Sequence, residues 1–256
     1  MSARDAAARF AITLQFHRDL TFFLKRGHAD GRVVRVLGEK TSVKDVIESC
    51  GVPHPEVDLI LCDGAACGFA FQLNGDAAVD VFPISAPVDQ HAADRLQRRN
   101  VSRFVVDGHL GKLARMLRLL GFDTVYRTDA DDAWLVQVAV ESGRALITRD
   151  RRLLMHAVIT DGYCPRSPYV DEQIVEVLRR FNLWSMMQPY TRCLRCNGML
   201  EHVEKDAVLA ELEPLTKIHY VEFRRCAACG HVYWSGSHFA KLEARVERVR
   251  ARGDQR

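Results

Sequence analysis

Two Cys-x-x-Cys pairs constrain the fold of this 256-residue chain more than any other feature of its sequence. Their members are Cys193, Cys196, Cys226 and Cys229. Each pair directs two thiolates to one side of a tight turn, and two such turns complete a tetrahedron around zinc. Gly198 and Gly230 follow the pairs closely, which allows the backbone to turn and its N–H groups to approach sulfur. The spacing predicts one closed, structural zinc site, with four free thiols or a redox pair as the alternatives.

The other four cysteines lie among apolar residues and are expected to be small core side chains in a reducing compartment. They are Cys50, Cys62, Cys67 and Cys164. The N-terminal segment "MSARDAAARF" has no apolar region typical of a secretory signal, and no run of about 18 apolar residues occurs in the chain. We therefore expect a cytoplasmic protein that does not interact with membranes.

The segment 10–84 contains several strand patterns around one short helix. The stretches "AITLQFH" and "RVVRVLG" predict two strands, and "VDLILCDG" and "DAAVDVFP" predict two more. Between them, "TSVKDVIESCG" predicts a helix that begins at Thr41 or Ser42 and ends at Gly51. This order of elements indicates a β-grasp domain at 10–84, and the polar segment 85–102 is predicted to be a linker.

Residues 103–182 alternate between strand and helix patterns. Strands are expected at 104–106, 124–127 and 145–148, and amphipathic helices at 110–120 and 131–142. A short helix, a last strand and a last helix are expected in the remainder of this segment. Repeated β–α units predict an α/β fold with a mostly parallel sheet and helices on both faces. Ligands of such sheets bind at the carboxyl ends of the strands.

Acidic residues follow the predicted strands of this sheet. Asp107 comes directly after the first strand, and Asp150 follows the strand at 145–148. The cluster "TDADD", with Asp131 and Asp132, precedes a helix and supplies a third acid, although capping of that helix explains one or two of its members. Carboxylates held together repel one another unless a cation is shared between them, and oxygen ligands select Mg²⁺ or Mn²⁺. We expect a divalent cation at this edge.

Several motifs resemble the Mut-seven C-terminal ribonuclease family, a branch of the PIN-like nucleases. They are "FVVDGHLGKLARMLRLLGFDT", "RALITRDRRLL" and "CGHVYWSGSH". The segment "TSVKDVIESCGVPHPEVDLIL" and "GDAAVDVFP" are similar to the ubiquitin-like domain that precedes the nuclease in many bacterial members. The resemblance implies a ubiquitin-like domain at 10–84, a PIN-like domain at 103–190, a zinc ribbon at 191–238 and a basic helical tail at 239–256.

The resemblance also implies an activity and its residues. The PIN-like acids that hold Mg²⁺ or Mn²⁺ and cut RNA correspond to Asp107, Asp150 and one of Asp131 or Asp132, of which Asp132 is the expected catalytic residue. The fourth acid has no clear counterpart, and Asp171 is the candidate. Metal-assisted hydrolysis of a phosphodiester bond would leave 5′-phosphate and 3′-hydroxyl ends. Because of the incomplete acid set, a non-catalytic RNA- or ribosome-binding protein remains the alternative.

Basic residues near the acids are expected to hold RNA phosphates. Segment 98–127 carries seven Lys or Arg residues against two acids. A solvated helix face is the competing interpretation for the basic residues in it. The expected RNA-binding residues are Lys112, Arg115, Arg118, Arg149, Arg151 and Arg152.

Some features allow two interpretations. Tyr233 and Trp234 could stack on bases, or could pack the ribbon against the nuclease, which is the favoured interpretation. The tail, with Leu242, Val246 and Val249 on one face of a helix, could dock on RNA or on the protein. Ribosomal RNA or the ribosome is a candidate target, and a protein partner is possible for the ubiquitin-like domain. A sulfur carrier is disfavoured, because segment 10–84 continues into a linker instead of a free Gly-Gly end.

Overall fold

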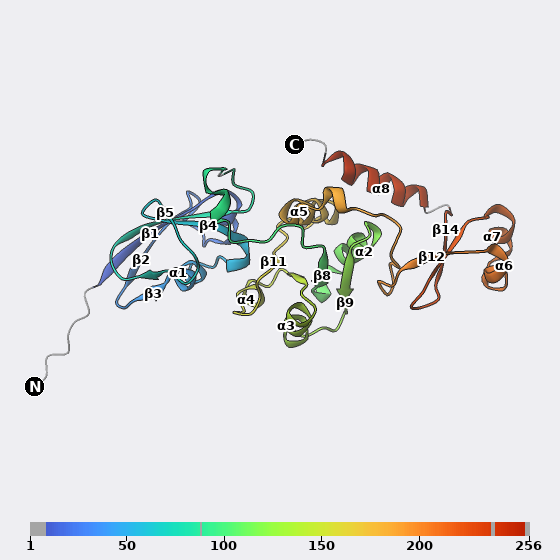
Figure 1. Ribbon diagram of the computed structural model, residues 1–256, viewed down its shortest axis with the longest axis horizontal. Helices are drawn as coiled ribbons and strands as arrows, with labels where there is room; N and C mark the ends of the chain where they lie inside the picture. Colours follow the sequence, from blue (N-terminus) through green and yellow to red (C-terminus); the bar gives the residue numbers. More distant parts are fainter. Residues whose placement is uncertain (1–8, 88, 237–238, 254–256) are drawn as a thin grey trace, which may run out of the picture. The chain divides into compact units, whose positions relative to one another are not determined.

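The computed structural model describes residues 9–87, 89–236 and 239–253 (Figure 1). Residues 88, 237, 238 and 254–256, which belong to the predicted linker, ribbon and tail, lie outside the described residues. Contacts divide the chain into two compact units. The first holds residues 1–99 and 148–166, and the second holds residues 100–147 and 167–256.

The first unit is built on a five-stranded sheet with the order β2-β1-β7-β4-β5. Strand β1 runs parallel to the central strand β7 and antiparallel to β2, which is the arrangement of a β-grasp fold. Alternate residues of β1 and β7 are buried, as expected for strands with one face on a core. The strands of this sheet are β1 (Phe10–Phe16), β2 (Arg32–Leu37), β4 (Val57–Cys62), β5 (Ala65–Ala66) and β7 (Ala77–Pro83).

Helix α1 (Val43–Ser49) supplies the apolar stripe that faces this core. It begins at Ser42, whose hydroxyl accepts a hydrogen bond from the Asp45 N–H at 3.1 Å. Val43 and Val46 of this stripe are buried. Short elements complete the unit, namely β3 (Thr41–Ser42), β6 (Gln72–Leu73), α4 (Arg151–Leu154) and β11 (Gly162–Tyr163).

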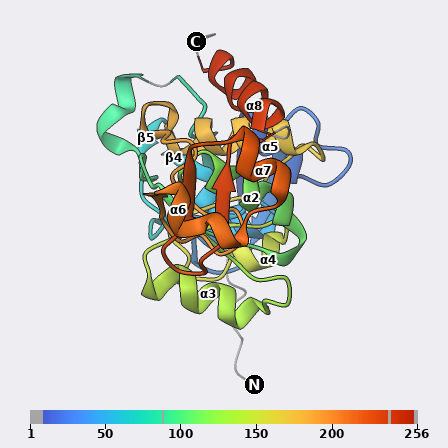
Figure 2. The same cartoon turned by 90° about the vertical axis from the view of Figure 1, so that its right-hand side faces the viewer.

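The second unit contains the parallel strands β8 (Arg103–Val106), β9 (Asp123–Tyr126) and β10 (Ala145–Ile147), with β8 in the middle. Figure 1 and Figure 2 place α5 (Val170–Phe181) and α3 (Asp132–Glu141) on opposite sides of these strands. Helix α2 (Gly111–Leu119) packs against α5 and β9. Its apolar residues Leu113 and Leu117 are fully buried, as their spacing predicts. The expected α/β fold with helices on both faces is confirmed.

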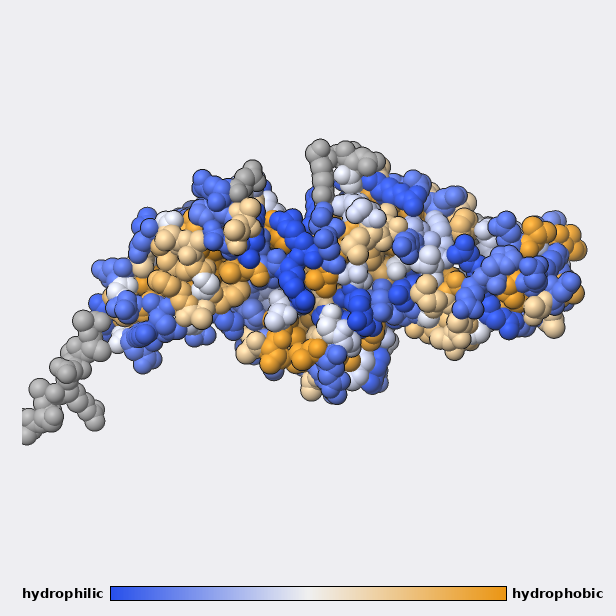
Figure 3. Space-filling view, viewed as in Figure 1, coloured by the Kyte–Doolittle hydropathy of each residue, from blue (hydrophilic) through white to orange (hydrophobic). Residues whose placement is uncertain are grey.

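The C-terminal part of this unit is a zinc ribbon with the strand order β12-β13-β14. Its strands are β12 (Leu200–Val203), β13 (Phe223–Cys226) and β14 (Val232–Trp234). Two short helices that the sequence patterns do not predict, α6 (Lys205–Val208) and α7 (Pro214–His219), lie between β12 and β13. Val208 of α6 and Phe223 of β13 belong to a small core, which packs α6 on the ribbon. Figure 3 shows hydrophobic residues on the surface of this region, where Leu215 and Ile218 are exposed.

Helix α8 (Phe239–Ala251) docks on the second unit. Val246 and Val249 are buried, and Arg245 forms an ion pair with Asp171 of α5 at 2.5 Å. The described part of the tail therefore packs on the protein itself. Within the described residues, no helix is both long and apolar enough to cross a membrane. Isolated 3-10 turns occur at Arg18–Phe23, His54–Glu56, Asp89–Asp94, Gly108–Leu110, Trp184–Met186 and Leu209–Glu211.

Candidate functional site

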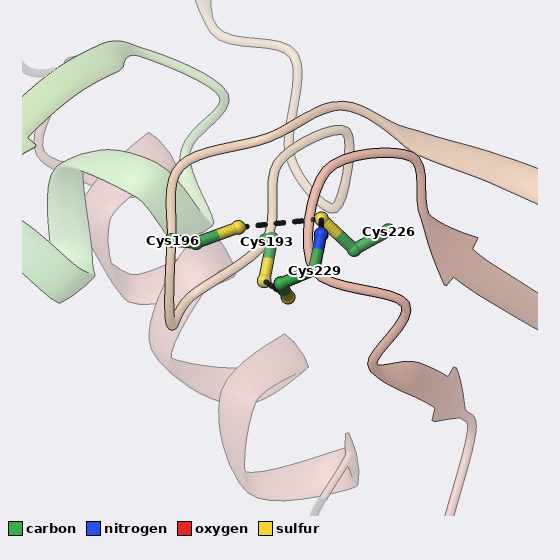
Figure 4. A group of neighbouring side chains, drawn as sticks. All are labelled: Cys193, Cys196, Cys226 and Cys229. Carbon is green, nitrogen blue, oxygen red and sulfur yellow. Dashed lines mark hydrogen bonds between the residues drawn. The ribbon is translucent and has the colours of Figure 1, made fainter.

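The four paired cysteines converge at one point of the ribbon (Figure 4). Their sulfur atoms all lie within 4.8 Å of one another. The Cys193 and Cys229 sulfurs are 3.7 Å apart, and the Cys196 and Cys226 sulfurs are 3.4 Å apart. A tetrahedral zinc with Zn–S bonds of about 2.3 Å separates its ligands by about 3.8 Å. The donor set and its spacing therefore fit a structural zinc.

The electrostatics of the cluster also favour a bound cation. Burial alone would raise the pKa of Cys193, but hydrogen bonds from Tyr233 and from the backbone of Cys196 and Arg195 lower it to about 6. Burial and the contacts with the other three sulfurs raise the pKa of Cys196 to about 12. The negative charge of one thiolate thus disfavours ionisation of the neighbouring thiols, and a bound cation would offset this repulsion.

Two neighbours of the cluster shape the zinc site. The Tyr233 hydroxyl lies 3.2 Å from the Cys193 sulfur and accepts a hydrogen bond from the Leu194 N–H at 3.0 Å. Tyr233 therefore orders the first cysteine turn, which is a role that its sequence context does not reveal. At Gly198, a Cβ atom would lie 2.8 Å from the Cys226 sulfur, so the cluster has no room for a side chain there.

The first cysteine turn is anchored to the parallel sheet. Asn197 has a left-handed backbone (φ 74°), and its side chain donates to Asp123 at 2.7 Å and accepts from the Thr124 N–H at 2.9 Å. Arg118 of α2 donates to the carbonyl oxygens of Thr124 and Arg195, both at 2.9 Å. These contacts tie the zinc turn to the end of α2 and the start of β9.

The position of Arg118 contradicts one expectation about the basic residues of α2. Arg118 was expected among the RNA-binding residues, but it is only 4% exposed and its guanidinium is occupied by backbone carbonyls. Its acceptors come from β9 and from the distant zinc turn, so the spacing within α2 does not predict its burial. Lys112 and Arg115 of the same helix are exposed.

Asp107 lies directly after β8, at the carboxyl end of the parallel sheet. Its carboxylate accepts a hydrogen bond from the His109 N–H at 3.2 Å and so caps a 3-10 turn. Gly108 and Gly111 allow this turn to approach β9 closely. A Cβ at Gly108 would lie 2.7 Å from the Thr128 carbonyl oxygen, and one at Gly111 would lie 2.5 Å from the Tyr126 hydroxyl. The glycines of the "DGHLGK" motif thus position the turn that carries Asp107.

The other expected acids also lie at helix starts. Asp150 accepts hydrogen bonds from the N–H groups of Arg152 (2.7 Å) and Leu153 (3.2 Å) and begins α4. Asp131 accepts one from the Trp134 N–H at 2.8 Å and begins α3. Asp132 is exposed in the first turn of α3. Capping of α3 therefore accounts for Asp131, as expected for one or two members of the "TDADD" cluster. Asp132 does not cap α3, so it is the member of the cluster that is kept as the candidate metal ligand.

The acids do not form a compact cluster comparable to that of the cysteines. In the part of the chain that the structure describes, the cysteine cluster is the group in which three or more potential ligands converge. Asp171, the candidate fourth acid, is paired with Arg245. A divalent cation at Asp107, Asp132 and Asp150 therefore stays a prediction.

The remaining basic residues differ in their surroundings. Arg149 and Arg152 are exposed, and Arg149 donates to the carbonyl oxygens of Pro165 and Arg166. Arg151 is half-buried, donates to the Phe23 carbonyl oxygen at 2.8 Å and lies 5.2 Å from the Phe22 ring. Arg151 thus has a structural role in the first unit.

Comparisons with known proteins agree with this architecture. The model of the Mut7-C RNAse domain matches residues 102–246, which is more than half of the chain. The chain belongs to this family. The model of the Mut7-C ubiquitin domain matches residues 10–89, so the β-grasp unit of this Mut7-C protein is its ubiquitin-like domain.

The matched Mut7-C RNAse region includes the parallel strands, the cysteine cluster and most of α8. The solution structure of the Haloferax volcanii HVO 2177 protein is similar to 34% of the chain and 99% of its own, with 20% identity and a TM-score of 0.26. No curated protein sequence matches the chain.

Proposed function

We propose that this Mut7-C protein is a ribonuclease that hydrolyses RNA phosphodiester bonds with the help of Mg²⁺ or Mn²⁺. The observation that carries the proposal is the position of two acids along neighbouring parallel strands. Val106 and Ile147 are paired in the register of β8 and β10, and the Asp107 N–H donates to the Ile147 carbonyl oxygen at 3.0 Å. Asp107 directly follows β8, and Asp150 follows β10 by three residues.

The donor chemistry suits a hard divalent cation. We infer that Asp107, Asp132 and Asp150 supply its carboxylate ligands. When bound, such a cation lowers the pKa of a coordinated water and neutralises charge on the leaving oxygen. The capping hydrogen bonds to Asp107 and Asp150 restrict the rotamers of the two side chains.

Exposed basic residues would bind the substrate. Lys112 and Arg115 extend from the helix that follows Asp107, and Arg149 and Arg152 flank Asp150 in the chain. Positive charge next to a carboxylate site offsets the repulsion between these acids and an entering polyanion. Contacts to phosphate would bind many RNA sequences with similar affinity.

The proposal can be tested with purified, zinc-containing protein and a structured RNA. We expect cleavage in the presence of Mn²⁺ that stops on addition of a chelator in excess over Mn²⁺. Asp107→Asn and Asp150→Asn should each lower the cleavage rate at least about 100-fold, because each removes a ligand charge. Asp206→Asn, an exposed acid of α6, is the control and should cleave normally. Wild-type rates in both site variants would contradict the assignment.

A non-catalytic RNA- or ribosome-binding protein is the second candidate. It is favoured by the ion pair between Asp171, the candidate fourth acid, and Arg245 of α8. In this pair Asp171 holds α8 on the protein instead of binding a metal ion. This candidate predicts RNA binding that persists without divalent cation, and no cleavage of any structured RNA by protein with a full zinc content.

A further inference from the structure

The hairpin formed by β4 and β5 in the first unit carries two cysteines outside the zinc cluster. Cys62 is the last residue of β4, and Cys67 directly follows β5. The turn between the strands uses Asp63 and Gly64, whose φ angles are 49° and 81°. Beyond the turn, the Cys67 N–H donates to the Ile60 carbonyl oxygen at 3.0 Å. The backbone therefore holds the two cysteines in a defined register.

This register brings the two thiols together. Cys62 is paired with Ala65, and Cys67 lies opposite Ile60, so the two cysteines are diagonal neighbours on the same face of the hairpin. Their sulfur atoms are 2.8 Å apart and share a hydrogen bond. Cys62 is only 6% exposed, whereas Cys67 is partly accessible to solvent. A small reagent can thus reach Cys67, and the Cys62 sulfur lies in contact with the Cys67 sulfur.

The contact also gives the two thiols different pKa values. The hydrogen bond from Cys62 lowers the pKa of Cys67, although burial acts in the opposite direction. The same hydrogen bond, together with burial, raises the pKa of Cys62. Cys67 therefore has more thiolate character, and thiolates are the form that reacts with oxidants.

We propose that Cys62 and Cys67 are a redox-active dithiol that a hydroperoxide converts into an intramolecular disulfide. The Cys67 thiolate attacks the terminal oxygen of the hydroperoxide and becomes a sulfenic acid as the O–O bond breaks. The alkoxide or hydroxide that leaves takes up the proton that Cys67 lost on ionisation and departs as alcohol or water. Cys62 then loses its proton, and its sulfur attacks the Cys67 sulfur and expels hydroxide, which takes up that proton to form water. Overall, two thiols and one hydroperoxide give one disulfide, one alcohol and one water, and two equivalents of an external thiol reverse the change.

The remaining cysteines of the described chain are poor competitors for this reaction. Burial raises the pKa of Cys50 and raises that of Cys164 to about 11, so both favour the inert thiol form. The four ribbon cysteines are occupied when zinc is bound. The disulfide would close the hairpin at β5, one of the two edge strands of the ubiquitin-like sheet.

Peptide mapping of the zinc-loaded full chain tests this proposal directly. The protein is treated with an equimolar amount of hydrogen peroxide, alkylated, and digested with trypsin and a glutamate-specific protease. Segment 57–95 contains no internal Lys, Arg or Glu, so it is released as one peptide whose cysteines are Cys62 and Cys67 alone. We expect this peptide to be unalkylated and lighter by two hydrogen atoms, and to accept two alkyl groups after reduction with dithiothreitol.

Variants separate the two steps. Cys62→Ser should leave Cys67 as a sulfenic acid that dimedone traps, and Cys50→Ser should form the disulfide as the wild-type protein does. A wild-type peptide that carries two alkyl groups after peroxide treatment overturns the proposal, whether or not the variants fold. A peptide in which Cys67 is linked to any cysteine other than Cys62 also overturns it.

Discussion

The Arg118 guanidinium donates a hydrogen bond of 2.9 Å to the carbonyl oxygen of Arg195, which lies within the first cysteine turn of the zinc cluster. The same guanidinium donates to the Thr124 carbonyl oxygen in β9. One buried cation on α2 thus connects the parallel sheet to the zinc ribbon. Because the Arg195 acceptor is a backbone oxygen, its position depends on the fold of the first cysteine turn.

Replacement of Arg118 should destabilise the second unit without a direct effect on RNA contacts. Arg118→Ala removes the donor to the buried Thr124 carbonyl and to the carbonyls of the cysteine turn, and we expect a loss of roughly 2–4 kcal/mol in the free energy of unfolding. Urea denaturation of zinc-loaded protein measures this loss. Arg115→Ala, one turn away and exposed, is the matched control and should change stability by less than about 0.5 kcal/mol. Equal stability of the two variants would contradict the anchoring role.

Arg118 also illustrates where the sequence pattern stops being informative. The leucine spacing of α2 correctly predicts its buried face, because that pattern reflects local helix geometry. Burial of Arg118 depends on carbonyl oxygens from residues 194 and 195, more than 70 positions away in the chain. No local pattern contains this information. A basic residue beside an apolar stripe can therefore belong to either the surface or the core.

The cysteine cluster was predictable because the ligand type and the spacing of the pairs are enough to indicate it. The helices α6 and α7 were not, since each is too short for a periodic pattern to emerge. The "TDADD" acids show an intermediate case. The sequence shows that these acids precede a helix. Only the structure shows that Asp131 is the capping residue, because its carboxylate accepts a hydrogen bond from the Trp134 N–H.

The exposed basic residues of α2 should contribute to RNA affinity through phosphate contacts. We expect Lys112→Ala and Arg115→Ala each to weaken binding of all RNAs similarly, and to lower the salt slope of binding by roughly one unit. Filter binding over a series of salt concentrations measures both quantities. Lys40→Ala, an exposed residue of the ubiquitin-like domain, is the control and should leave the slope unchanged. Wild-type slopes in both α2 variants would mean that this face is only solvated.

Asp131 and Asp132 should respond differently to the same substitution. Asparagine is as good an N-cap as aspartate, so Asp131→Asn should preserve both stability and cleavage rate. Asp132→Asn should preserve stability but reduce Mn²⁺-dependent cleavage by about 100-fold, as expected for loss of a metal ligand. Parallel rate and melting measurements compare the two variants. A reversed order of rates would assign the metal contact to Asp131 instead.

The zinc cluster should bind one metal ion and depend on Gly198. Metal analysis of the purified chain should give about one zinc per molecule. Cys226→Ser should lose the metal and unfold the ribbon at a lower temperature than the rest of the chain. Gly198→Ala should weaken zinc retention against a chelator, because the added methyl group would lie 2.8 Å from the Cys226 sulfur. Gly75→Ala, with open space around its Cα, is the control.

Asp123 should make the second unit sensitive to acid. Its carboxylate accepts hydrogen bonds from Arg144 at 2.8 Å and from Asn197 at 2.7 Å. Burial acts to raise the pKa of Asp123, but these hydrogen bonds and the charges of Arg144 and Arg192 outweigh it and lower the pKa below its usual value. A carboxyl group whose pKa is lower in the folded state stabilises the fold above its unfolded pKa of about 3.9.

That stabilisation is lost as the pH falls from about 4 through the lower folded pKa of Asp123. Asp123→Asn should cost roughly 2 kcal/mol at neutral pH, because the Arg144 side chain is only 9% exposed and loses its anionic partner. The cost should shrink as the pH decreases below about 4, since the wild-type carboxylate is then protonated as well. Urea unfolding at a series of pH values measures the difference between the two proteins. Asp206→Asn, an exposed acid in the same unit, should follow the wild-type curve throughout. A cost that stays constant down to the acid-unfolded state would show that the charge of Asp123 is not what holds the first cysteine turn against β9.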